Sequence, residues 1–429
     1  MSVSKQELNG KRLLLLGGRL WKETIREFCS ENNIRIITAG NRPGSDLNKI
    51  ADEYYNVNTT DPSAMKQLIQ DKKIDGVYLG GNETVIGAAV KYVNELSMPC
   101  YCDSRQWNML QNKRNLKRLF MENDLPVVPE YDYDRIMTDE GFNDYPVVTK
   151  PADGSGSEGF SVCHNRSEFE KGYQHAADNS LTGNVIIEKF VKNTSVVVFY
   201  TFSNGDLYFS GIEDKYPVRY EQQGSYVAGM HLFQSRTVDD FRSKYEHKLK
   251  TMFSSIGLRE GTVWMEVFYD SGCYYFNEAG YRYSGSVSPY PIEYLFGYNQ
   301  IASDICYSLT GKSDLLVSSS SLIQRVEKKG HYAIYSIHIK PGRIVQTEGF
   351  DELLKKPNVV AVPVTKNRGE TVESSGSIGQ VYAFVHFTYD DEEELREMLK
   401  GIQDSLVVKD EQGENMICKM IDLDTLVIR

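Results

Sequence analysis

Two glutamates lie in neighbouring apolar stretches that are typical of a β-hairpin. Glu266 falls within "TVWMEVFY" (262–269) and Glu278 within "CYYFNEAG" (273–280), and the joining loop ends at Gly272. A two-residue loop would place the carboxylates on opposite faces. A three-residue loop, with the glycine in the left-handed conformation, would place them diagonally on one face, about 7–8 Å apart. Two such acids suffice for magnesium, which completes its octahedron with water and substrate phosphates.

The alternative for this pair is an exposed hairpin with two solvated glutamates. Trp264, Phe268, Tyr274 and Phe276 surround the acids in sequence and favour a partly buried face. Unpaired carboxylates are costly on such a face. The pattern therefore favours a pair of acids that share a cation.

A lysine at the end of another strand-like run precedes a glycine-rich loop. In "YPVVTKPADGSGSEGF" (145–160), Lys150 comes just before Ser155, Gly156 and Ser157. Backbone N–H groups of glycine-rich loops bind phosphate oxygens. The familiar phosphate loop has its lysine after the glycines, at the start of a helix. The reversed order predicts either a different phosphate-binding architecture or a mobile surface loop.

The first part of the chain alternates between strand and helix. The pattern predicts an open parallel α/β sheet with ligand-facing loops at the strand ends, including Asn82 and Glu83. "GGRLWKET" lacks the spaced glycines of a dinucleotide site, which argues against a nicotinamide enzyme. The predicted strands are 12–18, 34–40 and 74–81, and the predicted helices are 24–32, 64–73 and 85–96.

The middle of the chain predicts a mixed set of strands and helices. A basic amphipathic helix begins near residue 112, and a hairpin is expected about Asn204-Gly205, a strong turn signal. Lys215 and Arg219 lie in a glycine- and tyrosine-rich segment (215–229) that predicts a pocket wall or a solvated loop. His231 has no local partner that marks a base. The remaining predicted strands are 145–150, 184–191, 195–202 and 206–214, and the remaining helix is 239–258.

A serine-rich connector then leads into a C-terminal α+β region. Its predicted strands are 331–339, 359–366 and 380–389, and an acidic helix follows at 390–406. This region is expected to wall the active site or to support a homodimer interface. The predicted domains are 1–112, 113–310 with a lid subdomain at about 126–190, and 311–429.

Composition narrows the classes of partner. The net charge is −11, from 48 Lys and Arg against 59 Asp and Glu, so nothing favours binding to nucleic acid or an anionic membrane. The seven cysteines are scattered, as reduced thiols of a cytosolic protein would be. No apolar run approaches the roughly 18 residues of a membrane helix. We expect a cytoplasmic protein that acts on small molecules.

Taken together, these segments resemble the ATP-grasp superfamily, and in particular its carboxylate–amine ligases. The resemblance covers the whole chain and includes L-amino-acid ligases, carbamoyl-phosphate synthases and biotin carboxylases. It implies an N-terminal open parallel α/β domain, a two-lobed ATP-grasp domain and a C-terminal β-rich α+β domain.

The resemblance also implies a set of site residues. Lys113, in "QNKRNLKRLF", matches the first phosphate-contacting lysine and Lys150 the second, with 153–159 as the lid over the phosphates. Arg282 would hold the γ-phosphate or a carboxylate. The implied cofactors are ATP and Mg²⁺ or Mn²⁺. The metal ligands would be Glu266 and Glu278, the lid contacts Ser155, Gly156 and Ser157, and the adenine contacts Glu188, Lys189, Phe190 and Val191.

The sequence departs from the family pattern at a few positions. Thr194 and Ser195 stand where a ribose-binding glutamate is frequent, and the lid has Glu158 where a basic residue is frequent. Gly280 occupies the place of the usual metal-site asparagine. Asn277 does not obviously replace it, because strand alternation sends it to the other face from the neighbouring acid.

The resemblance implies a reaction that begins with phosphoryl transfer. A substrate carboxylate attacks the γ-phosphorus of ATP to give an acyl phosphate and ADP, and an amine, with amino acids foremost, then displaces phosphate. An enzyme of the carbamoyl-phosphate-synthase or carboxylase kind that uses bicarbonate is one alternative. A catalytically silent ATP-binding protein is the other.

Overall fold

The computed structural model describes residues 3–153, 159–191, 194–220, 226–270, 272–317, 329–373 and 376–428. The predicted lid residues Ser155, Gly156 and Ser157 lie outside the described residues, as does Glu158.

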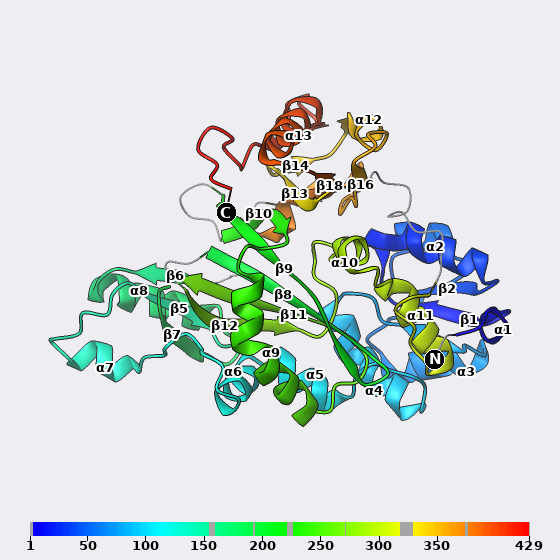
Figure 1. Cartoon of the computed structure of the whole chain (residues 1–429), viewed down its shortest axis with the longest axis horizontal. Coiled ribbons are helices and arrows are strands. Elements are labelled where there is room, and N and C mark those ends of the chain that lie inside the picture. Colours follow the sequence, from blue (N-terminus) through cyan, green and yellow to red (C-terminus); the bar gives the residue numbers. More distant parts are fainter. Residues whose placement is uncertain are drawn as a thin grey trace.

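The N-terminal part is a parallel sheet with helices on both faces, as predicted (Figure 1). The strand order is β3-β2-β1-β4. Leu14 packs into one hydrophobic cluster, and Leu13 and Leu15 pack into another, so this strand is apolar throughout. The short, partly exposed β3 carries no apolar run and was not predicted. The elements are α1 (Lys5–Leu8), β1 (Arg12–Leu15), α2 (Lys22–Glu31), β2 (Arg35–Ala39), β3 (Glu53–Tyr55), α3 (Pro62–Asp71), β4 (Gly76–Tyr78), α4 (Glu83–Glu95) and α5 (Ser104–Gln111), with short 3₁₀ helices at Arg19–Trp21 and Asp46–Ile50.

A small antiparallel sheet follows, with the order β6-β5-β7. Figure 1 places it at the far end of the molecule from β1 and β2. Val148 pairs with Glu188 and Lys150 with Ile186, so Lys150 and Glu188 share a face. The elements are α6 (Lys113–Glu122), α7 (Tyr133–Thr138), β5 (Val147–Pro151), β6 (Ser161–Cys163), α8 (Arg166–Asp178) and β7 (Val185–Lys189).

A long sheet of antiparallel pairs runs between these two ends of the molecule, in the order β12-β11-β8-β9-β10-β13-β18-β16. The predicted hairpin at Asn204-Gly205 is confirmed. Ser203 pairs with Asp206 across a two-residue turn, and both turn residues have positive φ, 54° and 89°. The elements up to residue 310 are β8 (Thr194–Ser203), β9 (Asp206–Arg219), β10 (Tyr226–Phe233), α9 (Val238–Ser255), β11 (Gly261–Asp270), β12 (Cys273–Gly280), α10 (Pro289–Phe296) and α11 (Gln300–Thr310).

The C-terminal region is α+β, and its strands continue the long sheet. Met230 of β10 pairs with Tyr335 of β13, so the sheet has no break at the predicted boundary near residue 310. The domain boundaries themselves stay predictions. The elements are β13 (His331–Ile339), β14 (Gly342–Arg343), β15 (Gln346–Glu348), α12 (Phe350–Leu353), β16 (Val359–Ala361), β17 (Thr371–Val372), a 3₁₀ helix (Ile378–Gln380), β18 (Val381–Tyr389), α13 (Glu392–Ser405), β19 (Val407–Lys409) and β20 (Ile417–Cys418).

Hydrophobic clusters join the N-terminal sheet to the long sheet. One contains Val77 together with Met265, and another contains Tyr78 together with Phe199. The loops at the ends of the N-terminal strands are therefore held firmly against the long sheet. Within the described part of the chain, none of the helices is both long and apolar enough to cross a membrane.

Candidate active site

The β11–β12 hairpin brings Glu266 and Glu278 face to face. Asp270 pairs with Cys273, so the loop has two residues, and the three-residue register that we expected for a shared face is wrong. The acids share a face for another reason. The register shifts between Glu266 and Val267, so that Glu266 pairs directly with Glu278. The extra residue of this β-bulge is Asn277.

The bulge also turns Asn277 toward the site. Its Nδ2 donates a hydrogen bond of 2.9 Å to Glu266 Oε2. The expectation from strand alternation that Asn277 would not serve this face is therefore wrong, because alternation fails where two residues oppose one. A run of alternating residues carries no signal for a bulge, so the sequence alone could not place this amide.

The absence of the family's asparagine at Gly280 has a packing reason. A Cβ atom at Gly280 would lie 2.4 Å from Cε2 and Nε1 of the Trp264 indole. Gly280 pairs directly with Trp264 across the hairpin. The indole of Trp264 thus fills the space that a side chain at position 280 would need. The amide of Asn277 reaches Glu266 from the bulge instead.

Glu266 is held by three donors. Lys215 Nζ lies 2.5 Å from Glu266 Oε1, and Ser195 Oγ donates to the same oxygen at 3.1 Å. Asn277 donates to the other oxygen. Burial alone would raise the pKa of Glu266, but the ion pair with Lys215 outweighs it and lowers this pKa. Glu266 is therefore a carboxylate at neutral pH.

Glu278 has a different environment. Burial raises its pKa, and the facing charge of Glu266 raises it further. The charges of Lys113 and Lys215 oppose this rise. Lys113, the first residue of α6, is half-buried, and burial lowers its pKa against the attraction of Glu278. The predicted phosphate lysine therefore lies within electrostatic reach of the predicted metal acids.

Lys150 and Glu188 form the second part of the site. Lys150 Nζ lies 2.5 Å from Glu188 Oε2, and Lys117 Nζ lies 2.8 Å from Glu188 Oε1. Burial would raise the pKa of Glu188, but Lys150 and then Lys117 outweigh it, so the pKa is lowered. Lys117 also pairs with Glu130 at 2.6 Å. The sequence does not predict Lys117 as a site residue, although it lies one helical turn after Lys113 on the same helix.

The two parts of the site meet at Lys113. The pKa of Lys113 responds to the charges of Glu278, Lys150 and Glu188. The structure thus gathers both predicted phosphate lysines, both predicted metal acids and the predicted hinge acid into one charged cluster.

The predicted adenine-binding segment is partly committed to other contacts. The backbone N–H of Lys189 donates to Pro129 O at 2.9 Å, and that of Phe190 donates to Pro146 O at 3.0 Å. These two N–H groups are therefore already hydrogen-bonded, and an adenine base would have to contact other atoms of Lys189 and Phe190. Val191 is buried at the end of this segment.

Arg282 lies where the long sheet meets the N-terminal part. Its guanidinium contacts Glu83 Oε1 through Nη2 at 2.6 Å and Nε at 2.9 Å. It also packs over the Trp264 ring, 5.2 Å from the centroid. Glu83 is the first residue of α4, and the predicted substrate-facing Asn82 caps that helix by accepting from Val85 N–H at 3.1 Å.

A buried acid–base pair lies farther along the same sheet face. His231 Nδ1 and Glu213 Oε1 are 2.7 Å apart, and both side chains are buried. Val197 pairs with both Glu266 and Glu213, which places all three side chains on one face. His231 thus has a partner that is distant in sequence and that only the strand register reveals.

The two acids fit a divalent cation. They face each other with like charge, and the pKa of Glu278 is raised first by burial and then by the charge of Glu266. Among the described residues, no group of three or more His, Cys, Asp and Glu side chains is placed to hold a metal ion. Magnesium takes one or two carboxylates plus substrate phosphates, so this donor set suits it.

Comparisons with known proteins agree with this geometry. Residues 113–199 match the model of the carbamoyl-phosphate synthase L chain, ATP binding domain, which includes Lys113, Lys150 and Glu188. The structure resembles that of L-amino acid ligase from Bacillus licheniformis, with a TM-score of 0.71 and 17% identity over 94% of this chain and 99% of that one.

The chain has the fold of ATP-grasp proteins.

Sequence relatives of this chain include ligases and a transferase. The formate-dependent phosphoribosylglycinamide formyltransferase of Proteus mirabilis is 23% identical over 287 residues, which are 64% of this chain and 68% of the relative. The D-alanine–D-alanine ligase of Borrelia turicatae is 31% identical over 138 residues, 29% of this chain and 37% of the relative. The prediction of an ATP-grasp ligase is confirmed.

Proposed function

We propose that this ATP-grasp protein activates a carboxylate as an acyl phosphate, releases ADP and phosphate, and joins the acyl group to an amine. The observation that carries the proposal is the direct pairing of Glu266 with Glu278, beside Lys113 and Lys215. Paired acids beside half-buried lysines suit a polyphosphate that brings its own cation.

The residues of the chain supply position and charge. Lys113 and Lys150 are proposed to bind the phosphates of ATP, with Glu188 holding Lys150 at the floor of the site. Glu266 and Glu278 would hold Mg²⁺ or Mn²⁺, which supplies charge neutralisation to the phosphates when bound. Arg282 is proposed to hold the γ-phosphate or the substrate carboxylate through its planar fork.

In this proposal two bonds form and two break. A carboxylate oxygen attacks the γ-phosphorus and the bond to the β-phosphate oxygen breaks, which leaves ADP. The amine nitrogen then attacks the acyl carbon, and the bond from that carbon to the phosphate-bearing oxygen breaks. The contribution of the chain is to hold the reactants in line and to neutralise charge.

Arg282 and Glu83 support an amino acid as one substrate. Their ion pair places a cation and an anion 2.6 Å apart at one point of the site. A zwitterionic α-amino acid carries the same two charges. When Arg282 and Glu83 separate, its carboxylate can pair with Arg282 and its ammonium group with Glu83. The similarity to an L-amino acid ligase and a D-alanine–D-alanine ligase supports the same class.

The site is expected to work in the cytoplasm on small molecules. The seven cysteines are free thiols, including the buried Cys29 and Cys306, which supports a reducing compartment. A homodimer stays a prediction.

The test is a screen of purified protein with magnesium-ATP against a grid of carboxylates and amines, with separate readings of ADP, AMP and phosphate. We expect ADP release that depends on one organic carboxylate and rises further with an amine. The Glu278→Gln variant should release none, because it loses one carboxylate charge of the pair. ADP release that follows bicarbonate instead, AMP as the sole product, or no release with any pair would each contradict the proposal.

A further inference from the structure

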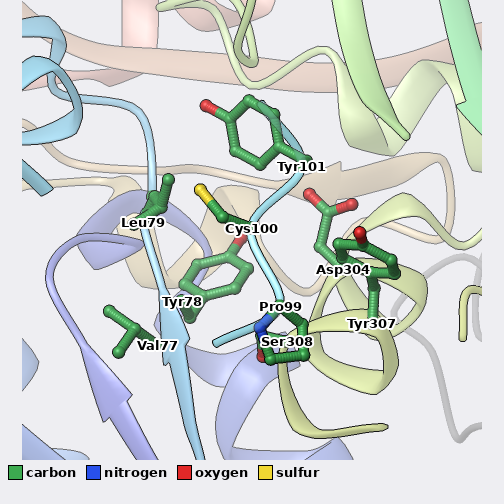
Figure 2. Close-up of a pocket in the computed structure, with 10 residues that line it drawn as sticks. Val77, Tyr78, Leu79, Pro99, Cys100, Tyr101, Asp304, Tyr307 and Ser308 are labelled. Atoms are coloured by element: carbon green, nitrogen blue, oxygen red, sulfur yellow. The ribbon is translucent and has the colours of Figure 1, made fainter. Parts of the chain in front are cut away.

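A small cavity lies between the N-terminal sheet and α11 (Figure 2). Its volume is about 20 Å³, enough for one water molecule. Figure 2 shows Asp304 and Tyr307 on one wall, across from Leu79 and Cys100. Asp304 is thus a carboxyl beside a small cavity lined mostly by apolar and aromatic groups.

Asp304 is linked to Arg282 through one residue. The Tyr283 hydroxyl donates a hydrogen bond to Asp304 Oδ2. The carbonyl oxygen of Tyr283 accepts from Arg282 Nη1 at 2.7 Å. The side chain of Tyr283 therefore contacts Asp304, and its backbone contacts the guanidinium.

The residues on both sides of Arg282 are anchored to the N-terminal part. Tyr281 OH donates to Tyr101 O at 2.9 Å, and Tyr101 OH donates to Tyr281 O at 3.0 Å. Tyr283 packs edge-on against Trp21, with ring centroids 5.3 Å apart. The position of Arg282 thus depends on two buried tyrosines, and Asp304 holds the second.

We propose that Asp304 is a positioning residue for Arg282, and that its carboxylate form fixes Tyr283 and, through the Tyr283 carbonyl, the guanidinium. A charge-assisted hydrogen bond from a tyrosine to a carboxylate is stronger than one to a neutral carboxyl. Protonation of Asp304 therefore loosens the link, and Arg282 shifts relative to Glu83 and Trp264.

The surroundings of Asp304 place its titration in the physiological range. Burial raises the pKa of Asp304 to about 7, against the hydrogen bond from Tyr283 and with a further rise from the charge of Glu260. The other titratable groups that face it are Tyr78, Cys100, Tyr101, Cys306 and Tyr307. Burial keeps Tyr78, Tyr101, Tyr283, Tyr307 and Cys306 neutral near this pH, since it raises the pKa of each. The pKa of Cys100 is instead lowered, chiefly by its hydrogen bond with Cys102. The positioned state is thus present above the pKa of Asp304 and is lost as the pH falls through it.

Tryptophan fluorescence tests the link without any substrate. The chain has three tryptophans, and replacing Trp107 with Phe leaves Trp21, which contacts Tyr283, and Trp264, which contacts Arg282. In this background we expect the emission to change with a midpoint near pH 7. The change should vanish in Asp304→Asn and in Tyr283→Phe, with circular dichroism to confirm that each variant is folded.

Two further variants separate Asp304 from the other buried acids. Glu278→Gln should leave the transition in place, although Glu278 also has a raised pKa and lies near Trp264. Glu260→Gln should move the midpoint to lower pH, because one like charge is removed. A transition that survives in folded Asp304→Asn, or that disappears in Glu278→Gln, would overturn the proposal.

The catalytic consequence rests on the proposed role of Arg282. With a substrate pair in hand, the ratio kcat/KM of the wild type should rise with pH through about 7. The Asp304→Asn variant should lack this step. If the fluorescence transition depends on Asp304 but no ligase activity is found, the proposed function fails and the link stands. If activity is found and its profile is the same in Asp304→Asn, the positioning role fails and the function stands.

Discussion

Lys150 lies near the end of β5 with its ammonium group against Glu188, and Lys117 pairs with the other oxygen of the same acid. Lys150 could be predicted because it ends a strand-like run before a glycine-rich loop, whereas Lys113 and Glu188 followed from the resemblance to ATP-grasp proteins. Their partners could not be predicted. Lys117 meets Glu188 only through the tertiary fold, 71 positions away in sequence, and Ser195 meets Glu266 only through the β8–β11 register.

At the residue scale, Lys150→Ala should weaken magnesium-ATP binding about 10- to 150-fold, since a charged hydrogen bond contributes roughly 1.5–3 kcal/mol. Folding should survive, because Lys117 still pairs with Glu188. Calorimetric titration measures the effect. Lys355→Ala is the control, since Lys355 is exposed and pairs only locally with Glu352. Equal affinity in both variants would remove Lys150 from the site.

At the scale of elements, the sequence predicts the β11–β12 hairpin but not its bulge. Apolar alternation and Gly272 indicate two strands and a tight turn, and the structure has both. A bulge depends on how neighbouring strands and helices pack, so the register near Glu278 could not be derived. The same packing explains Gly280, which gives the Trp264 indole its place.

Gly280→Ala tests this packing. The new Cβ would lie 2.4 Å from the indole, so we expect the free energy of unfolding to fall by about 1–3 kcal/mol. In a Trp264→Ala background the same change should cost little, and the double-mutant cycle gives the coupling. Gly44→Ala is the control, because no atom lies within 4 Å of a Cβ there. Denaturant unfolding that shows no coupling would contradict the assignment.

At the scale of the whole molecule, the parallel N-terminal sheet was predicted well because each strand and helix has a local signal. The continuity of the long sheet from β12 to β16 was not predicted, since strand neighbours distant in sequence leave no such signal. The N-terminal part and the long sheet meet at the ion pair of Arg282 and Glu83, so the proposed substrate site takes one residue from each.

Transfer of isotopic oxygen tests the proposed chemistry of the assembled site most directly. A carboxylate substrate labelled with ¹⁸O in both oxygens, supplied with magnesium-ATP and the amine that the screen identifies, is followed by mass spectrometry of the released phosphate. Because the acyl phosphate forms through a carboxylate oxygen and breaks at the acyl carbon, we expect one ¹⁸O atom in each phosphate released. Label in AMP, or amide product with unlabelled phosphate, would contradict acyl-phosphate formation by this chain.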